Sequence, residues 1–238
     1  MTRLIFLILL IPFVSYGGDV KVFFKIAVDE RAYSSFLLEN LGAGHSALHD
    51  LASRLKEKHL EMDKIQKDFY NIKIDYGMKY YGHDVAQYDI VPILPDRFRH
   101  VLLVDEKWDQ ILRREVYDPD GKLIYAYSFE DRDGDLKPVV EQPRPAVTTG
   151  RDEFPGFKAV FKKELKDGTI QTLYSDGLNK FSVFVSKAEG EMKDSARILY
   201  GNYVFRKKVG ETLYTVVGTI PFPQMEKVVA RLAFKEEK

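Results

Sequence analysis

Two groups of side chains have the types and spacing of metal ligands, and the first lies near the N-terminus. His45 and His49 are four residues apart, a spacing that places two imidazoles on one face of a helix, and Asp50 and His59 follow closely. The zinc-protease motif needs a glutamate directly after its first histidine, and this sequence has serine there. We therefore favour a solvated helix face over a metal site.

The second group is acidic. Asp131, Asp133 and Asp135 surround Gly134 in the manner of the start of a calcium-binding loop. Such a loop has glycine at its sixth position and glutamate at its twelfth, whereas here the glycine is fourth and Gln142 is twelfth. A polar turn is the favoured interpretation.

Other catalytic signatures are absent from the sequence. It contains no Gly-x-Ser-x-Gly elbow, no phosphate-binding glycine loop and no cysteine that could act as a nucleophile or form a disulfide. We therefore predict a protein without a cofactor, a bound metal or catalytic residues. An enzyme with a metal at the His45/His49 helix is kept as a third hypothesis, behind the two binding functions described below.

The N-terminus has the pattern of an export signal. An apolar run, Leu4–Val14, follows Arg3 and ends at the small residues before position 18. We expect residues 1–18 to be removed, although an uncleaved N-terminal anchor is the alternative. Without them the chain has 35 basic and 36 acidic residues, a net charge of −1, which argues against nucleic acid as a partner.

Hydrophobic periodicity then predicts the elements that hold these residues. Residues 20–28 have strand character, 33–41 are interpreted as a helix, and Ser46 can cap a second helix. That second helix carries apolar residues at mostly helical spacing as far as Phe69. From there the period becomes two, which predicts strands over 69–76, 86–94, 97–105, 110–117 and 122–130.

The C-terminal third has the same alternating pattern after a proline-rich stretch. Residues 136–156 read as an extended linker, so we divide the chain into domains 19–135 and 157–238. A strand at 197–207 and another at 212–220 are expected, followed by a helix with one apolar face.

The most informative stretch is Tyr174–Val185. It reads as the end of one strand, a turn at Asp176-Gly177, and a second strand with apolar or aromatic residues on both faces. Its Tyr-Ser-Asp-Gly-Leu and Phe-Ser-Val-Phe segments resemble the C-terminal domain of the RseB/MucB proteins, which are periplasmic regulators of an envelope-stress sigma factor. Tyr117–Leu123 and Tyr214–Pro221 extend the resemblance in both directions.

The resemblance implies an α+β fold that is mostly antiparallel β. The first domain would be a shortened half-barrel with a helix, similar to the lipoprotein carriers LolA and LolB, with about half of the usual strands missing. The second would be a smaller antiparallel sheet with a C-terminal helix. The resemblance also implies a periplasmic location.

By the same resemblance, the protein would bind the periplasmic segment of an anti-sigma factor and shield it from proteolysis. We expect the partner to lie in a cleft between the 69–130 meander and the 157–234 domain, and we assign partner binding to Tyr174, Asp176, Gly177, Phe184 and Tyr203. The alternative is a lipid or lipoprotein carrier, whose acyl-binding surface we assign to four tyrosines on the first domain: Tyr76, Tyr80, Tyr81 and Tyr88.

Overall fold

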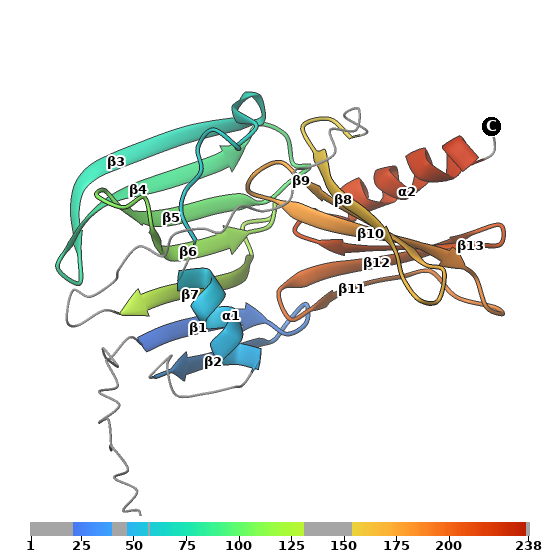
Figure 1. Cartoon of the computed structure of the whole chain (residues 1–238), viewed down its shortest axis with the longest axis horizontal. Helices are drawn as coiled ribbons and strands as arrows, with labels where there is room; N and C mark the ends of the chain where they lie inside the picture. Colours follow the sequence, from blue (N-terminus) through green and yellow to red (C-terminus); the bar gives the residue numbers. More distant parts are fainter. Residues whose placement is uncertain (1–20, 40–46, 57, 131–153, 237–238) are drawn as a thin grey trace, which may run out of the picture.

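Two open antiparallel sheets lie side by side in the protein (Figure 1). They are described here from a computed structural model, which covers residues 21–39, 47–56, 58–130 and 154–236. Two α-helices occur within these ranges, and each sheet carries one of them. The predicted fold, α+β with mostly antiparallel strands and a C-terminal helix, is confirmed.

The first sheet has seven strands in the order β2-β1-β7-β6-β5-β4-β3, and β2 and β3 form its edges. The five strands predicted from alternating hydrophobicity are all present, with bounds that differ by a few residues. The strands are β1 (Lys21–Ala27), β2 (Tyr33–Leu38), β3 (Tyr70–Tyr80), β4 (His83–Pro92), β5 (Arg99–Asp105), β6 (Ile111–Tyr117) and β7 (Leu123–Glu130).

The segment before Phe69 contributes more sheet than we predicted. Residues 33–41 were interpreted as a helix, but Tyr33–Leu38 form strand β2, which pairs with β1. Strand β1 in turn pairs with β7, so β1 and β2 extend the sheet beyond β7. Pairing with β1 satisfies the backbone of β2 and overrides a weak local helical pattern. The five-strand meander is thereby extended to seven strands.

Helix α1 (Ala47–Lys56) covers one face of this sheet (Figure 1). Its Ala52 is buried among residues of β1, β4, β5 and β7, and Leu51 and Leu55 pack beside it. The helix ends at Lys56, well before Phe69, because the following segment bridges to the β5–β6 turn through His59 and Gln110. A single-turn helix, η1 (Lys67–Phe69), then leads into β3.

The second sheet has six strands in the order β11-β12-β13-β10-β9-β8. The predicted strand at 197–207 is two strands, because Tyr200 and Gly201 both have positive φ and form a tight hairpin turn between them. The strands are β8 (Lys158–Glu164), β9 (Ile170–Ser175), β10 (Lys180–Lys187), β11 (Ser195–Leu199), β12 (Asn202–Val209) and β13 (Thr212–Gly218).

Helix α2 (Phe222–Glu236) starts directly after Pro221 and packs on one face of the second sheet. The predicted apolar face is confirmed, since Met225, Val228 and Val229 are fully buried. No helix among the described residues is long and apolar enough to cross a membrane.

Several predictions concern residues outside the described ranges. These are the signal segment, the acidic group at 131–135, most of the linker, and His45 together with the His49 side chain. Among the residues that are described, no group of three His, Asp or Glu side chains is arranged to hold a metal ion.

Candidate functional site

The turn between β9 and β10, residues 176–179, joins the two sheets. Its Leu178 is buried in the hydrophobic cluster of the first sheet rather than in that of its own sheet. A Cβ on Gly177 would lie 2.4 Å from the backbone oxygen of Lys64, so only glycine allows this approach. The turn therefore acts as a plug that fixes the second sheet against the first.

A buried carboxylate lies at the centre of the plug. Asp176 is 1% exposed and forms an ion pair with Arg97 from the loop before β5, at 3.2 Å between Oδ2 and Nη1. Tyr70 of β3 donates a hydrogen bond to the same carboxylate, and two backbone N–H groups of the turn donate to its other oxygen. Burial raises the pKa of Asp176, and these hydrogen bonds oppose that shift.

The next side chain, Asn179, continues the polar network into the first sheet. Its Nδ2 donates to the carbonyl of Phe98 at 3.2 Å, and its Oδ1 lies 3.1 Å from Nε2 of His100. Because Nη2 of Arg114 donates to Nδ1 of His100, the histidine proton must reside on Nε2 and point at Asn179. Burial, and secondly the charge of Arg114, lower the pKa of His100 well below its usual value.

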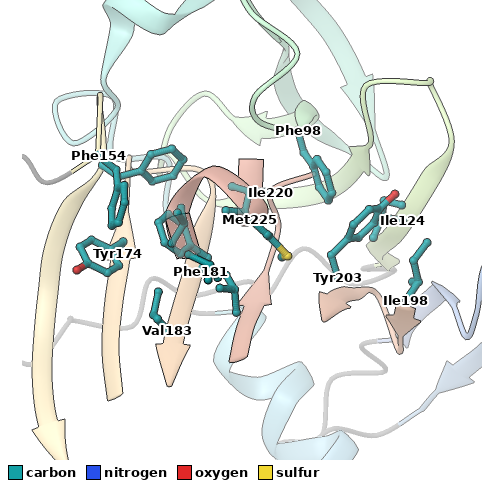
Figure 2. Packing of buried hydrophobic residues seen from close by; sticks show 14 of the residues in the cluster. Phe98, Ile124, Phe154, Tyr174, Phe181, Val183, Ile198, Tyr203, Ile220 and Met225 are labelled. Carbon is teal, nitrogen blue, oxygen red and sulfur yellow. The ribbon is translucent and has the colours of Figure 1, made fainter. Parts of the chain in front are cut away.

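Apolar residues from both sheets form one continuous cluster beside this network. Figure 2 shows Phe98 and Ile124 of the first sheet next to Tyr203 and Ile198 of the second, with Met225 of α2 between these and Phe181. The Phe98 and Tyr203 rings are 5.0 Å apart in an edge-to-face arrangement. The hydrophobic core is thus shared between the domains, which fixes their relative orientation.

A cleft of about 980 Å³ opens where the two sheets and α2 meet. Its floor is apolar and aromatic, with contributions from Phe69, Phe154, Tyr203 and Phe222. One wall is the loop carrying Leu94 and the β6–β7 turn, and the other is the first half of α2. The volume and the aromatic floor suit a short apolar segment of a ligand or partner.

The β6–β7 turn is held in place by an aspartate. Asp118 accepts backbone hydrogen bonds from Asp120 and Lys122 at 3.0 and 2.8 Å, and its other oxygen accepts the Tyr203 hydroxyl at 2.8 Å. Burial, and secondly the carboxylate of Asp118, raise the pKa of Tyr203. This bond connects the first domain to the cleft floor.

Charged side chains of both signs line the cleft. Lys227 and Arg231 come from α2, whereas Glu30, Asp120 and Lys122 come from loops of the first sheet. An extended segment in the cleft would therefore have apolar contacts along its length and charged groups of both signs beside it.

The five predicted partner-binding residues lie in different surroundings. Tyr174 is 3% exposed and stacks on Phe181, while Asp176 and Gly177 belong to the plug. Tyr203 lines the cleft floor, and Phe184 lies on the face of the second sheet that is turned away from α2. Of these five residues, only Tyr203 lines the cleft, and the partner-binding role of all five stays a prediction.

The four predicted lipid-binding tyrosines form two pairs rather than one group: the Tyr80 and Tyr81 rings are 4.7 Å apart, and Tyr76 lies near Tyr88. Tyr88 packs against the cluster under α1, whereas Tyr80 packs against Val85 and Leu103 on the opposite face of the sheet. Tyr81 occupies the β3–β4 turn with a φ of 45°, and Tyr76 is 67% exposed. A single acyl-binding groove that contains all four does not follow from this arrangement.

Several cleft residues were missed in the sequence. Phe222 lies between Pro221 and Pro223 after the last strand, and no role was assigned to it. Leu94 is 59% exposed and lies between Pro92 and Pro95. The apolar pair Ile93-Leu94 in this proline-flanked loop was the sequence feature that could have identified it. Outside the cleft, no local signal identifies the contact of Arg97 with Asp176, 79 residues away.

Comparison with known proteins agrees with this geometry. Residues 150–233 match the family model of the MucB/RseB C-terminal domain. The sigma-E factor regulatory protein RseB of Haemophilus influenzae is 23% identical over 201 residues, which cover 73% of this chain and 62% of that relative. The matched region therefore spans less than two thirds of the relative's length.

Solved structures show the same fold. The complex of Pseudomonas aeruginosa MucA and MucB matches with a TM-score of 0.53 at 17% identity, over 88% of this chain and 91% of that chain. A crystal structure of MucB gives a TM-score of 0.55 at 18% identity, over 89% and 90%. A complex of MucB with MucA(peri) gives 0.51 at 17% identity, over 90% and 91%. The resemblance to the RseB/MucB family is confirmed.

Proposed function

We propose that this chain, a protein of the RseB/MucB type, binds the periplasmic segment of an anti-sigma factor in the interdomain cleft and shields it from a site-specific protease. The curated relative is a sigma-E factor regulatory protein, and two of the similar structures are complexes of MucB with MucA. Release of the segment, when mislocalised envelope components accumulate, would then expose it to cleavage.

The observation that carries this proposal is the composition of the cleft. Its aromatic floor comes from both domains, and its charged walls offer polar anchors at the edges. Lining residues from both sheets and from α2 would cover part of a segment bound there, so a protease would have less access to the same backbone. Shielding of this kind requires no catalysis by this chain.

The proposal can be tested with a matched pair of surface variants. Leu94 lines the cleft and is 59% exposed, whereas its neighbour Ile93 is 54% exposed and does not line it. We expect Leu94→Asp to weaken binding of a fluorescently labelled anti-sigma periplasmic segment at least about tenfold, because it loses apolar contact and places a charge in the cleft. Ile93→Asp should change the dissociation constant less than about twofold.

Protease protection provides the second measurement. The unaltered chain and Ile93→Asp should slow cleavage of the segment, and Leu94→Asp should protect it poorly at the same concentration. Equal loss of binding in both variants, or none in either, would argue against the cleft as the binding site.

The lipid-carrier alternative rests on the other end of the first domain. The pKa of Tyr88 is raised mainly by burial and secondly by the nearby Tyr76 hydroxyl, so these two side chains lie close together. They offer aromatic surface that an acyl chain could cover. Mass spectrometry of the protein after purification without detergent would show a co-purified acyl lipid under this alternative.

A further inference from the structure

The second sheet has a face that α2 does not cover. Residues directly opposite one another in neighbouring strands project to the same face, so the pairing register identifies its members. Phe161 of β8 pairs with Leu173 of β9, which pairs with Ser182 of β10 and, across it, Val217 of β13. Phe184 lies on the next row of the same face. These side chains form an apolar band across four strands.

The band contains a hollow. Leu173, Phe184 and Val217 line a depression of about 310 Å³, with Lys180 and Asn202 at its edge. Ser182 and Gly218 also line it. The size corresponds to one large apolar side chain inserted from outside rather than to a whole ligand.

All charged side chains that the strands project on this face are basic. The pairing register places six of them there and no aspartate or glutamate: Lys158, Lys163, Lys180, Arg197, Arg206 and Lys208. On the α2 side of the same sheet, by contrast, Lys207 is neutralised by Glu226 at 3.1 Å.

Two of these basic groups have no acidic partner. Within the described part of the chain, neither Arg197 nor Arg206 forms an ion pair, although they lie on adjacent strands two residues apart in register. The Nε atom of Arg206 is buried and has no hydrogen-bond acceptor. Among the described residues, the two arginine side chains thus lack an acidic counter-charge, which a carboxylate supplied from outside would provide.

We propose that this face binds an acidic segment of a protein partner. A leucine- or phenylalanine-sized side chain enters the hollow beside Phe184, and neighbouring carboxylates pair with Arg197 and Arg206. This surface is separate from the cleft, whose contributions from the second sheet, Ile198 and Tyr203, project toward α2. A partner held in the cleft by an apolar stretch could be held here by an acidic one.

The occupant follows from the combination of features. A nucleic acid would match the charge but leave the apolar band uncovered, and a bilayer surface would not enter a one-residue hollow. An extended acidic peptide satisfies the hollow, the two unpaired arginines and the hydroxyls of Ser182 and Thr215 on the same face.

The test uses a fluorescein-labelled twelve-residue peptide in which glutamates alternate with leucine and one phenylalanine, titrated with the full chain. A second peptide has glutamine in place of every glutamate. The protein variants are Arg197→Gln/Arg206→Gln and Phe184→Ser, and the matched control is Arg54→Gln/Lys187→Gln, which removes two basic charges elsewhere. Thermal melting followed by circular dichroism verifies that each variant is folded.

We expect the acidic peptide to bind at least about tenfold more tightly than the glutamine peptide. Arg197→Gln/Arg206→Gln and Phe184→Ser should each weaken it at least about tenfold, the control less than about twofold, and Leu94→Asp not at all. The proposal would be overturned if the acidic peptide did not bind or if the control variant weakened binding equally. It would also be overturned if the protein bound only vesicles that contain phosphatidylglycerol. Because Leu94→Asp tests the cleft alone, the two sites can fail independently.

Discussion

At the scale of single residues, buried polar side chains hold the two domains together. Asp176, Arg97 and Asn179 are each at most 1% exposed, and each bonds to a residue of the other domain or of the loop between them. Removing one partner of such a pair leaves an uncompensated charge, which commonly costs about 3–5 kcal/mol. These residues therefore specify the domain arrangement that forms the cleft.

His100 gives this network a measurable pH dependence. In the folded protein it stays neutral, because burial and Arg114 lower its pKa, whereas a histidine in the unfolded chain takes up a proton below about pH 6.5. Acid therefore favours the unfolded state. The free energy of unfolding should decrease by up to about 1.4 kcal/mol per pH unit below that point on account of this one group.

The control is His100→Gln, whose amide can accept from Arg114 and donate to Asn179 without titrating. Urea denaturation at several pH values between 7.5 and 5 should give a shallower decrease for this variant than for the unaltered chain. Parallel curves for the two proteins would show that His100 does not contribute, since all other titrating groups are common to both.

At the scale of elements, the position of the second sheet against the first depends on the 176–179 turn. Gly177 and Gly168 both occupy β-turns of the second sheet with positive φ, 98° and 79°. Only Gly177 faces the other domain, whereas a Cβ on Gly168 would meet nothing within 4 Å. Gly168→Ala should thus cost about 1–2 kcal/mol for its backbone conformation alone.

We expect Gly177→Ala to cost clearly more than Gly168→Ala, because its Cβ also collides with the backbone at Lys64. Urea denaturation of the two variants measures the difference directly. If both variants were destabilised equally, the 176–179 turn could move away from the first sheet without a cost in free energy.

Strands in which apolar and polar residues alternate strictly could be predicted from the sequence. Elements whose conformation depends on pairing with a distant strand could not. Strands β3 to β7 and β10 follow the apolar period of two. Strand β2 was missed because its partner β1 decides its conformation, and the β11–β12 turn was missed because it places Tyr200 at positive φ, which is rare for a residue of this size.

At the scale of the whole molecule, the two sheets share a core, and the cleft lies where they meet α2. The sequence predicted a site between them, but it suggested Asp176 and Gly177 as surface residues for a partner. Their burial depends on Arg97 and Lys64, which are 79 and 113 residues away in the chain, and no local pattern encodes such contacts. The position of the cleft could therefore be predicted from the sequence, but the residues that line it could not.

The central claim is that a partner segment lies between the two walls of the cleft, and site-directed cross-linking tests it most directly. The chain contains no cysteine, so a single introduced cysteine can be labelled with a benzophenone maleimide without background. Leu94→Cys places the probe on one wall and Lys227→Cys on the other, and Ile93→Cys and Lys187→Cys are controls outside the cleft.

After irradiation with the anti-sigma periplasmic segment, mass spectrometry of the cross-linked peptides identifies the residues in contact. We predict that Leu94→Cys and Lys227→Cys both cross-link to one short stretch of the segment, while the two controls give little product. Cross-links from the controls alone, or to unrelated stretches from the two walls, would contradict a segment held between them.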